Sequence, residues 1–107
     1  MKHQELWTHY KLNIIMIASF RCAETKKLFA DQPSKRFRAI SRAARRKLEM
    51  IHSGHTLQDL RNPPGNHLEL LKGDRAGQHS IRINDQFRIC FRWVEGNAED
   101  VEIVDYH

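Results

Sequence analysis

The strongest pattern in the chain is a stripe of apolar residues at helical spacing. Its members are Phe37, Ile40, Ala44, Leu48 and Ile51. Because residues three and four apart share one face of a helix, the stripe predicts a helix that begins after a Ser34 cap and runs to about His52. Gly54 is the expected end of this helix. A shorter helix is predicted over residues 23–30, and a single helical turn over residues 57–60.

From residue 67 onward the pattern changes to the alternation typical of β-strands. The predicted strands lie at residues 67–71, 78–84, 87–93 and 100–105. The apolar segment 12–20 predicts one more strand before the first helix. Helices followed by an antiparallel meander indicate an α+β fold, in which helices cover one face of a twisted sheet.

Alternation within these strands assigns their residues to two faces. Apolar side chains occupy the face expected under the helices: Ile81, Ile83, Phe87, Ile89, Phe91 and Trp93. Arg82, Arg88 and Arg92 therefore project from the opposite face. A solvated sheet surface would explain these three arginines, and so would a surface that binds phosphate groups. Alternation alone leaves both interpretations open.

Composition and charge indicate a single globular domain that is suited to binding polyanions. The 107 residues suffice for one domain, and 40% hydrophobic with 29% charged residues is a globular balance. The net charge of +5 favours encounter with polyanions such as RNA, DNA or the ribosome. Two cysteines, Cys22 and Cys90, are too few for a disulfide framework and are expected to be reduced. The apolar stretch 12–20 is too short to span a membrane, so a cytoplasmic location is expected.

No metal or cofactor is expected from the sequence. His52 and His55 have a spacing seen in metal sites, but they have no acidic or cysteine companion, and a stable site needs three or four ligands. A glycine-rich phosphate-binding loop is also absent from the sequence.

A chemically distinctive tripeptide, Asp105-Tyr106-His107, follows the apolar strand residues 101–104. Cleavage of RNA by its own 2′-hydroxyl needs a proton acceptor, a proton donor and cations around the phosphate. Histidine suits the proton transfers, since its ordinary pKa lies near neutrality. Arginine and lysine suit the phosphate, and an aromatic ring can stack on a splayed base. The simpler alternative is an unstructured tripeptide without a function.

Several motifs follow one another in a fixed order. They are Met16-Ile17-Ala18-Ser19-Phe20, Leu71-Lys72-Gly73-Asp74-Arg75-Ala76-Gly77, Ser80-Ile81-Arg82, Phe87-Arg88-Ile89-Cys90-Phe91 and Val104-Asp105-Tyr106-His107. Together they resemble the HigB toxins of the RelE/ParE superfamily, over residues 16–107. Residues 1–15 lie outside the resemblance and are interpreted as an N-terminal extension or as a translation start placed too early.

The resemblance implies a RelE-like (microbial ribonuclease) fold and a ribosome-dependent endoribonuclease that cuts messenger RNA in the ribosomal A site without a metal. By position, Lys72 and Arg88 would hold the scissile phosphate and stabilise the transition state. Tyr106 would position the nucleotide. His107 would transfer a proton, and Asp105 would either orient His107 or act as the base.

Two positions depart from the family pattern. Glu69 stands where some relatives have a histidine, with His67 nearby. Gln78 and His79 stand where an aromatic residue can occur. Both departures are expected to affect the rate of RNA cleavage and the codon preference more than the class of activity.

Further arginines lie opposite the apolar stripe and along the sheet. Those expected to contact ribosomal RNA are Arg38, Arg42, Arg45, Arg46, Arg82 and Arg92. Solvation of a helix surface is the simpler explanation of the helical ones, whereas binding to ribosomal RNA would need many distributed phosphate contacts. The resemblance favours contact with ribosomal RNA.

The resemblance also implies a protein partner, a HigA-like antitoxin with a helix-turn-helix fold, bound away from the active site. The two proteins together would bind operator DNA and repress their own promoter. Two other functions stay open: a ParE-like toxin that inhibits DNA gyrase without catalysis, and a basic module that only binds nucleic acid. The terminal tripeptide, with Lys72 and Arg88, favours cleavage over both.

Overall fold

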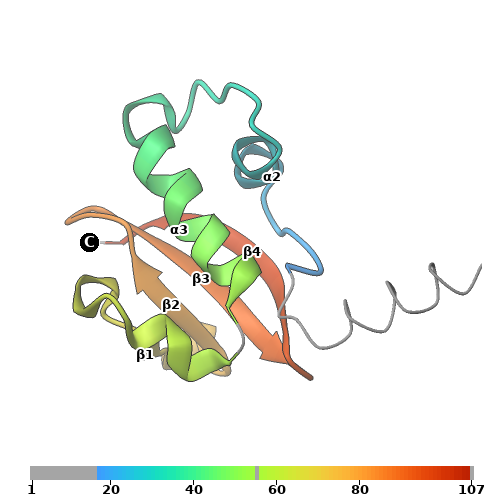
Figure 1. The fold of residues 1–107 in the computed structure, drawn as a ribbon, viewed down its shortest axis with the longest axis vertical. Helices are drawn as coiled ribbons and strands as arrows, with labels where there is room; N and C mark the ends of the chain where they lie inside the picture. The colour runs from blue at the N-terminus through green and yellow to red at the C-terminus, as the bar shows by residue number, and fades with distance from the viewer. Residues whose placement is uncertain (1–16, 55, 107) are drawn as a thin grey trace, which may run out of the picture.

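The computed structural model describes residues 17–54 and 56–106 (Figure 1). Within these residues, two α-helices pack against an antiparallel sheet of four strands, which confirms the predicted α+β class. Residues 1–15, the predicted extension, lie outside the described residues, as does most of the first predicted strand.

The helical layer consists of α2 (Ala23–Phe29) and α3 (Ser41–Ser53). A 3-10 turn, η1 (Arg38–Ile40), precedes α3 directly. The short helix predicted over residues 23–30 is confirmed by α2. Neither helix of the described part is long and apolar enough to cross a membrane.

The predicted start of the main helix was wrong, because Ser34 caps a tighter turn. Its hydroxyl accepts the backbone N–H of Phe37 at 3.3 Å and donates to the carboxylate of Glu24 at 2.7 Å. Ile40 then has φ −111° and ψ 8°, which lies outside the helical region. A continuous helix cannot pass through that conformation, so α3 begins only at Ser41.

The sheet lies in chain order, and each strand is antiparallel to its neighbour. Its strands are β1 (Glu69–Leu70), β2 (Gln78–Arg82), β3 (Phe87–Val94) and β4 (Asn97–Asp105). Every predicted strand from residue 67 onward is present, with shifted ends. The first is reduced to two residues because His67, with φ 44°, has a left-handed backbone that interrupts the extended chain.

A segment from the start of the described chain adds to the edge of the sheet. Residues 17–20 run parallel to β4, with bridges from Ile17 to Ala98 and from Phe20 to Val101. These residues are the described part of the strand predicted over 12–20. They place α2 directly above β4, as Figure 1 shows.

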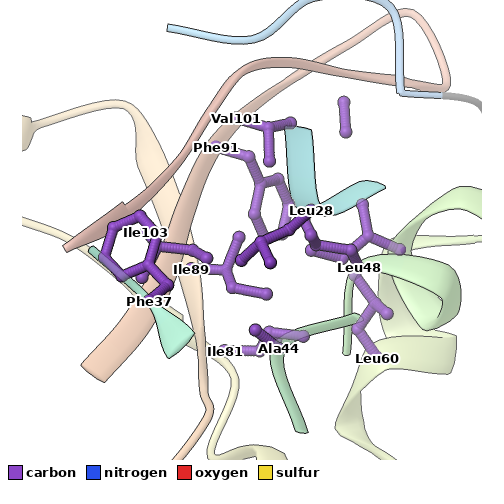
Figure 2. Close-up of a cluster of buried hydrophobic side chains, with 12 residues drawn as sticks. Leu28, Phe37, Ala44, Leu48, Leu60, Ile81, Ile89, Phe91, Val101 and Ile103 are labelled. Atoms are coloured by element: carbon purple, nitrogen blue, oxygen red, sulfur yellow. The ribbon is translucent and has the colours of Figure 1, made fainter. Parts of the chain in front are cut away.

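The core fills the space between the helices and one face of the sheet (Figure 2). Its buried members are Leu28, Phe37, Ala44, Leu48, Ile51, Leu60, Ile81, Ile89, Phe91, Ala98, Val101 and Ile103. The predicted helix stripe and the predicted inner sheet face therefore meet. Each fully buried Leu, Ile or Phe contributes about 1.5–3 kcal/mol of transfer free energy.

Two 3-10 turns connect α3 to β1, and a third lies between β1 and β2. They are η2 (Leu57–Arg61), η3 (Pro64–Asn66) and, after β1, η4 (Gly73–Arg75). The helical turn predicted over residues 57–60 is confirmed by η2.

Asn66 fixes this connection to the rest of the fold. The residue is fully buried, and its amide donates to the carbonyls of Leu60 (3.1 Å) and Asn62 (3.2 Å). Its side-chain oxygen accepts a hydrogen bond from Lys47 of α3. All polar atoms of this buried amide are thus satisfied, and the backbone of the next residue, His67, is held beside β2.

Candidate active site

Three of the predicted site residues, Arg82, Arg88 and Arg92, lie on the sheet face that turns away from α2 and α3, called the site face below. It comprises Gln78, Ser80, Arg82, Arg88, Cys90, Arg92, Glu102 and Val104. The register pairs Arg82 with Arg88 and Arg88 with Val104. Because Ile89 and Phe91 face the core, alternation places Arg88 on the opposite side, as the sequence predicted.

Arg88 is buried on this face, so it is not part of the solvated surface that was one of the two interpretations of the three arginines. Only 7% of the residue is exposed. Its Nε donates to the hydroxyl of Ser80 at 2.7 Å, and its Nη2 donates to the backbone carbonyls of His67 and Ser80. Its Nη1 lies 3.6 Å from a carboxylate oxygen of Glu69. These acceptors come from β2, β1 and the turn before β1, so one guanidinium joins three segments.

Tyr106 stacks on this anchored guanidinium. The Arg88 Cζ lies 5.7 Å from the centre of the Tyr106 ring, within the range of a cation–π contact. The backbone N–H of Tyr106 donates to the carbonyl of Gln86 at 2.7 Å, which holds the residue just beyond β4. Tyr106 is 41% exposed, so solvent still reaches its ring. The structure therefore brings two of the predicted site residues together.

Asp105 is the last residue of β4, directly before Tyr106, and its side chain contacts Gln86. It pairs with Phe87 across β3 and β4, and its carboxylate accepts a hydrogen bond from the Gln86 amide at 3.0 Å. Because Asp105 pairs with Phe87 whereas Arg88 pairs with Val104, alternation places the Asp105 side chain on the face opposite Arg88. Gln86 contacts both Asp105 and Tyr106. His107, to which the resemblance assigns proton transfer, lies outside the described residues.

Lys72 lies towards the other end of β2. The N–H of Leu71 donates to the carbonyl of Gln78, the first residue of β2, whereas Arg88 is paired with Arg82, its last. Lys72 is exposed, and in the part of the chain that the structure describes its side chain makes no ion pair or hydrogen bond. Lys72 thus lies in the connection between β1 and η4, and no contact joins its side chain to Arg88 within the residues that the structure describes.

Arg75 extends over the site face, and the sequence did not predict a role for it. Its Nη1 donates to the Glu102 carboxylate at 2.8 Å and to the Gln78 side-chain oxygen at 3.1 Å, so it reaches from η4 across to β4. The hydrogen bond with Glu102 raises the pKa of Arg75. The signal that could have revealed Arg75 is Glu102 itself, an acidic residue that alternation places on a basic face.

Cys90 lies on the site face between these two arginines. It is fully buried, and both Cys22 and Cys90 are free thiols, as predicted. Burial raises the pKa of Cys90, and the charges of Arg75 and Arg88 act in the opposite direction. A buried thiol with a raised pKa is a poor nucleophile, so Cys90 fills space in the sheet.

The arginines of the helical layer do not form the single basic face that the sequence suggested. Arg45 binds the end of α2: its Nε donates to the carbonyl of Leu28 and its Nη2 to the carbonyl of Gln32, each at 3.1 Å. Arg38 lines a hollow of about 810 Å³ between α2 and the start of α3. Arg42 and Arg46 are exposed.

A second basic cluster joins α3 to the sheet. Lys47 is half-buried beside Arg46 and Arg82, and burial, followed by these two charges, lowers the pKa of Lys47. Arg82 also forms an ion pair with Asp85. Arg92, by contrast, is exposed near the far end of β3, opposite Gln78.

Two histidines that the sequence singled out have structural contacts. The Nδ1 of His52 accepts the backbone N–H of Ile17 at 3.3 Å, and His55 lies outside the described residues. Within residues 17–54 and 56–106, no three His, Cys, Asp or Glu side chains converge as metal ligands. His79 stacks on Phe91 with ring centres 6.2 Å apart, and burial lowers its pKa.

Comparison with known proteins identifies relatives of this chain. Residues 18–107 match the family model of HigB-like toxins, described as RelE-like toxins of the type II toxin–antitoxin system HigB. Over 60 residues the chain is 47% identical to Toxin HigB-1 of Vibrio cholerae serotype O1. These 60 residues are 56% of this chain and 63% of that protein. The chain thus spans a little under two thirds of that relative. Over 79 residues it is 37% identical to an uncharacterized protein of Haemophilus influenzae, covering 74% of this chain and 77% of that protein.

The contacts of Arg88 predict a difference in stability between two arginines of one strand. Arg88→Ala leaves the buried Ser80 hydroxyl and the part-buried His67 carbonyl without their donor, so the free energy of unfolding should fall by about 2 kcal/mol. Arg92→Ala, at an exposed position, should change it by less than about 0.5 kcal/mol. Urea denaturation of both variants measures this, and equal losses would contradict the anchoring role of Arg88.

Proposed function

The chain belongs to the HigB-like toxins of type II toxin–antitoxin systems, and we propose that it acts as a ribosome-dependent endoribonuclease that cuts messenger RNA in the A site. The observation that supports this most is the stacking of Tyr106 on the buried Arg88. It joins the terminal segment, which carries the acid and base candidates, to the positively charged face of the sheet. Cleavage of RNA needs both kinds of group in one place.

The proposed reaction is an attack of the 2′-oxygen on the adjacent phosphorus. A base takes the proton of the 2′-hydroxyl, the bond to phosphorus forms, and the bond to the 5′-oxygen breaks as an acid donates a proton to it. The products are a 2′,3′-cyclic phosphate and a 5′-hydroxyl. Proton transfer and cationic side chains suffice for these steps, so the proposal includes no metal or cofactor.

Each predicted residue has a role in this reaction that follows from its chemistry. His107 transfers a proton, and Asp105 either orients it or acts as the base. Tyr106 stacks on a nucleotide with the ring face that Arg88 does not cover, because 41% of the residue is exposed. Lys72 is exposed and extends its ammonium group to the phosphate.

The role of Arg88 differs from the one that the resemblance alone implies. Its nitrogens already face protein acceptors, so it has little capacity left for a bidentate phosphate contact. Its proposed contribution is the positive potential of a fixed charge and the position of Tyr106. A fixed charge in a partly buried site stabilises the transition state without having to reorganise.

The partners in this proposal are messenger RNA, the ribosome and an antitoxin. A HigA-like antitoxin with a helix-turn-helix fold binds the toxin in the cytoplasm, and the complex binds operator DNA. A ParE-like inhibitor of gyrase and a simple nucleic-acid-binding module are the competing functions. Both lack catalysis, so a cleavage assay separates them from the proposal.

Cleavage should depend on the terminal residues. Native protein, His107→Ala, Tyr106→Ala and a protein lacking residue 107 are added to ribosomes programmed with messenger RNA, and new RNA ends are mapped. The native protein should cut. Loss of His107 should lower the rate about 10²–10⁴-fold, the range of a lost proton-transfer group.

The matched control is His9→Ala, which removes a histidine outside the matched residues 18–107 and should cut at the native rate. Cleavage at equal rates by all variants would refute the assigned site. If no protein cuts, the endoribonuclease proposal fails, and gyrase inhibition becomes the function to assay.

Contact with ribosomal RNA is proposed for the exposed arginines of α3. Arg42→Glu with Arg46→Glu should weaken ribosome binding and lower the slope of log affinity against log salt by about 1 for each phosphate that the protein no longer neutralises. Arg45 is left intact, because it holds the end of α2 and its replacement would disturb the fold. Arg61→Glu, on exposed η2, is the control. Binding by the double variant with native affinity and native salt dependence would exclude this surface.

A further inference from the structure

We infer that Arg75 contacts the RNA phosphate in the site, with its guanidinium held in position by Glu102 and Gln78. The inference rests on the proposed function and adds a residue to it. It is based on a difference between Arg88 and Arg75. The nitrogens of Arg88 already face protein acceptors, whereas Arg75 uses one nitrogen for its contacts with the protein.

The contacts of Arg75 are all made by one nitrogen. Its Nη1 donates to Glu102 at 2.8 Å and to Gln78 at 3.1 Å. Towards the residues that the structure describes, its Nε and Nη2 donate no hydrogen bond. The side chain is 30% exposed, whereas that of Arg88 is 9% exposed, donates hydrogen bonds from both Nε and Nη2, and has its Nη1 in an ion pair with Glu69. Arg75 therefore has donors left for a ligand, and solvent can reach them.

Arg75 lies in the same part of the site face as the Arg88 and Tyr106 pair. Arg75 donates to Glu102, which pairs with Cys90, and Arg88 pairs with Val104, two residues further along β4 on the same face. Tyr106 stacks on Arg88 at the end of that strand. A phosphate next to the Tyr106 ring would thus lie within the field of both arginines. Of these two arginines, Arg75 is the one with nitrogens left to give the phosphate hydrogen bonds.

The ion pair with Glu102 makes Arg75 well suited to this contact. The side chain of Glu102 is 17% exposed, and Glu102 belongs to β4, the strand that ends at Asp105 and is followed by Tyr106. The pair fixes the guanidinium relative to these residues before RNA arrives, and a preorganised donor costs no reorganisation during the reaction. A guanidinium can hold a carboxylate with one nitrogen and a phosphate with the others, because its donors form a rigid fork.

The same ion pair also fixes the turn that carries Lys72. Arg75 ends η4, and its backbone N–H donates to the Lys72 carbonyl at 3.3 Å. Gly73, with φ 65°, has the left-handed backbone that lets the chain turn between them. Arg75 and Lys72 would therefore approach the phosphate from one rigid turn.

The test compares Arg75→Ala, Arg75→Lys and Glu102→Gln in single-turnover cleavage of ribosome-bound messenger RNA. Arg75→Ala should lower the rate about 10²–10³-fold, the effect of removing one preorganised donor. Arg75→Lys keeps the charge and the pairing with Glu102 but loses the fork, so it should stay well below the native rate at native thermal stability. Glu102→Gln keeps an acceptor for Arg75 and should lose less than Arg75→Ala. Arg61→Ala is the control for loss of an exposed arginine.

A purely structural role for Arg75 would give a different order of effects. Arg75→Lys would then cut at the native rate, and Glu102→Gln would lose as much rate and stability as Arg75→Ala. Either result would overturn the inference while leaving the endoribonuclease proposal intact.

A second measurement does not depend on cleavage. In ¹⁵N-arginine spectra, the Arg75 Nε–H resonance should shift when a short single-stranded RNA is added, and that of Arg88 should shift less. An Arg75 resonance that does not move would overturn the inference even if the native protein proves unable to cut RNA.

Discussion

Because the sheet buries Arg88, its guanidinium has to find acceptors inside the protein, and the surrounding structure supplies them. The Ser80 hydroxyl comes from the neighbouring strand, and the His67 carbonyl comes from a left-handed residue before β1. That residue is held in turn by Asn66, whose buried amide contacts α3 through Lys47. A buried charge without such partners would cost several kcal/mol. Tyr106 stacks on this anchored charge, and its backbone N–H is held by the carbonyl of Gln86.

The two guanidiniums of the site face illustrate how burial divides roles among chemically identical groups. Arg88 is enclosed by acceptors and serves as a fixed charge and a stacking platform. Arg75 is held through a single nitrogen by Glu102, and its side chain is partly exposed. A site built in this way combines the fixed charge of Arg88 with a second guanidinium, that of Arg75, which is held in position and still has donors for a phosphate. The raised pKa of Arg75 belongs to the same arrangement, since the Glu102 hydrogen bond favours the charged form.

Much of the fold could be predicted because its signals are periodic and local. The apolar stripe identified the buried face of α3, and alternation correctly placed Arg88 on the site face. The start of α3 could not be read in this way, because Ser34 bonds within a turn that resembles a helix start. The Arg75–Glu102 pair joins residues 27 positions apart, so only the strand register reveals it. The burial of Arg88 likewise depends on the path of a distant loop.

The chemistry of the RNA ends tests the proposed reaction most directly. Messenger RNA cut on the ribosome by the native protein is isolated, and the ends on both sides of the break are identified. Attack by the 2′-hydroxyl predicts a 2′,3′-cyclic phosphate or 3′-phosphate upstream and a 5′-hydroxyl downstream. A 3′-hydroxyl with a 5′-phosphate would mean that water is the nucleophile, and it would contradict the roles proposed for the terminal residues and the site-face cations.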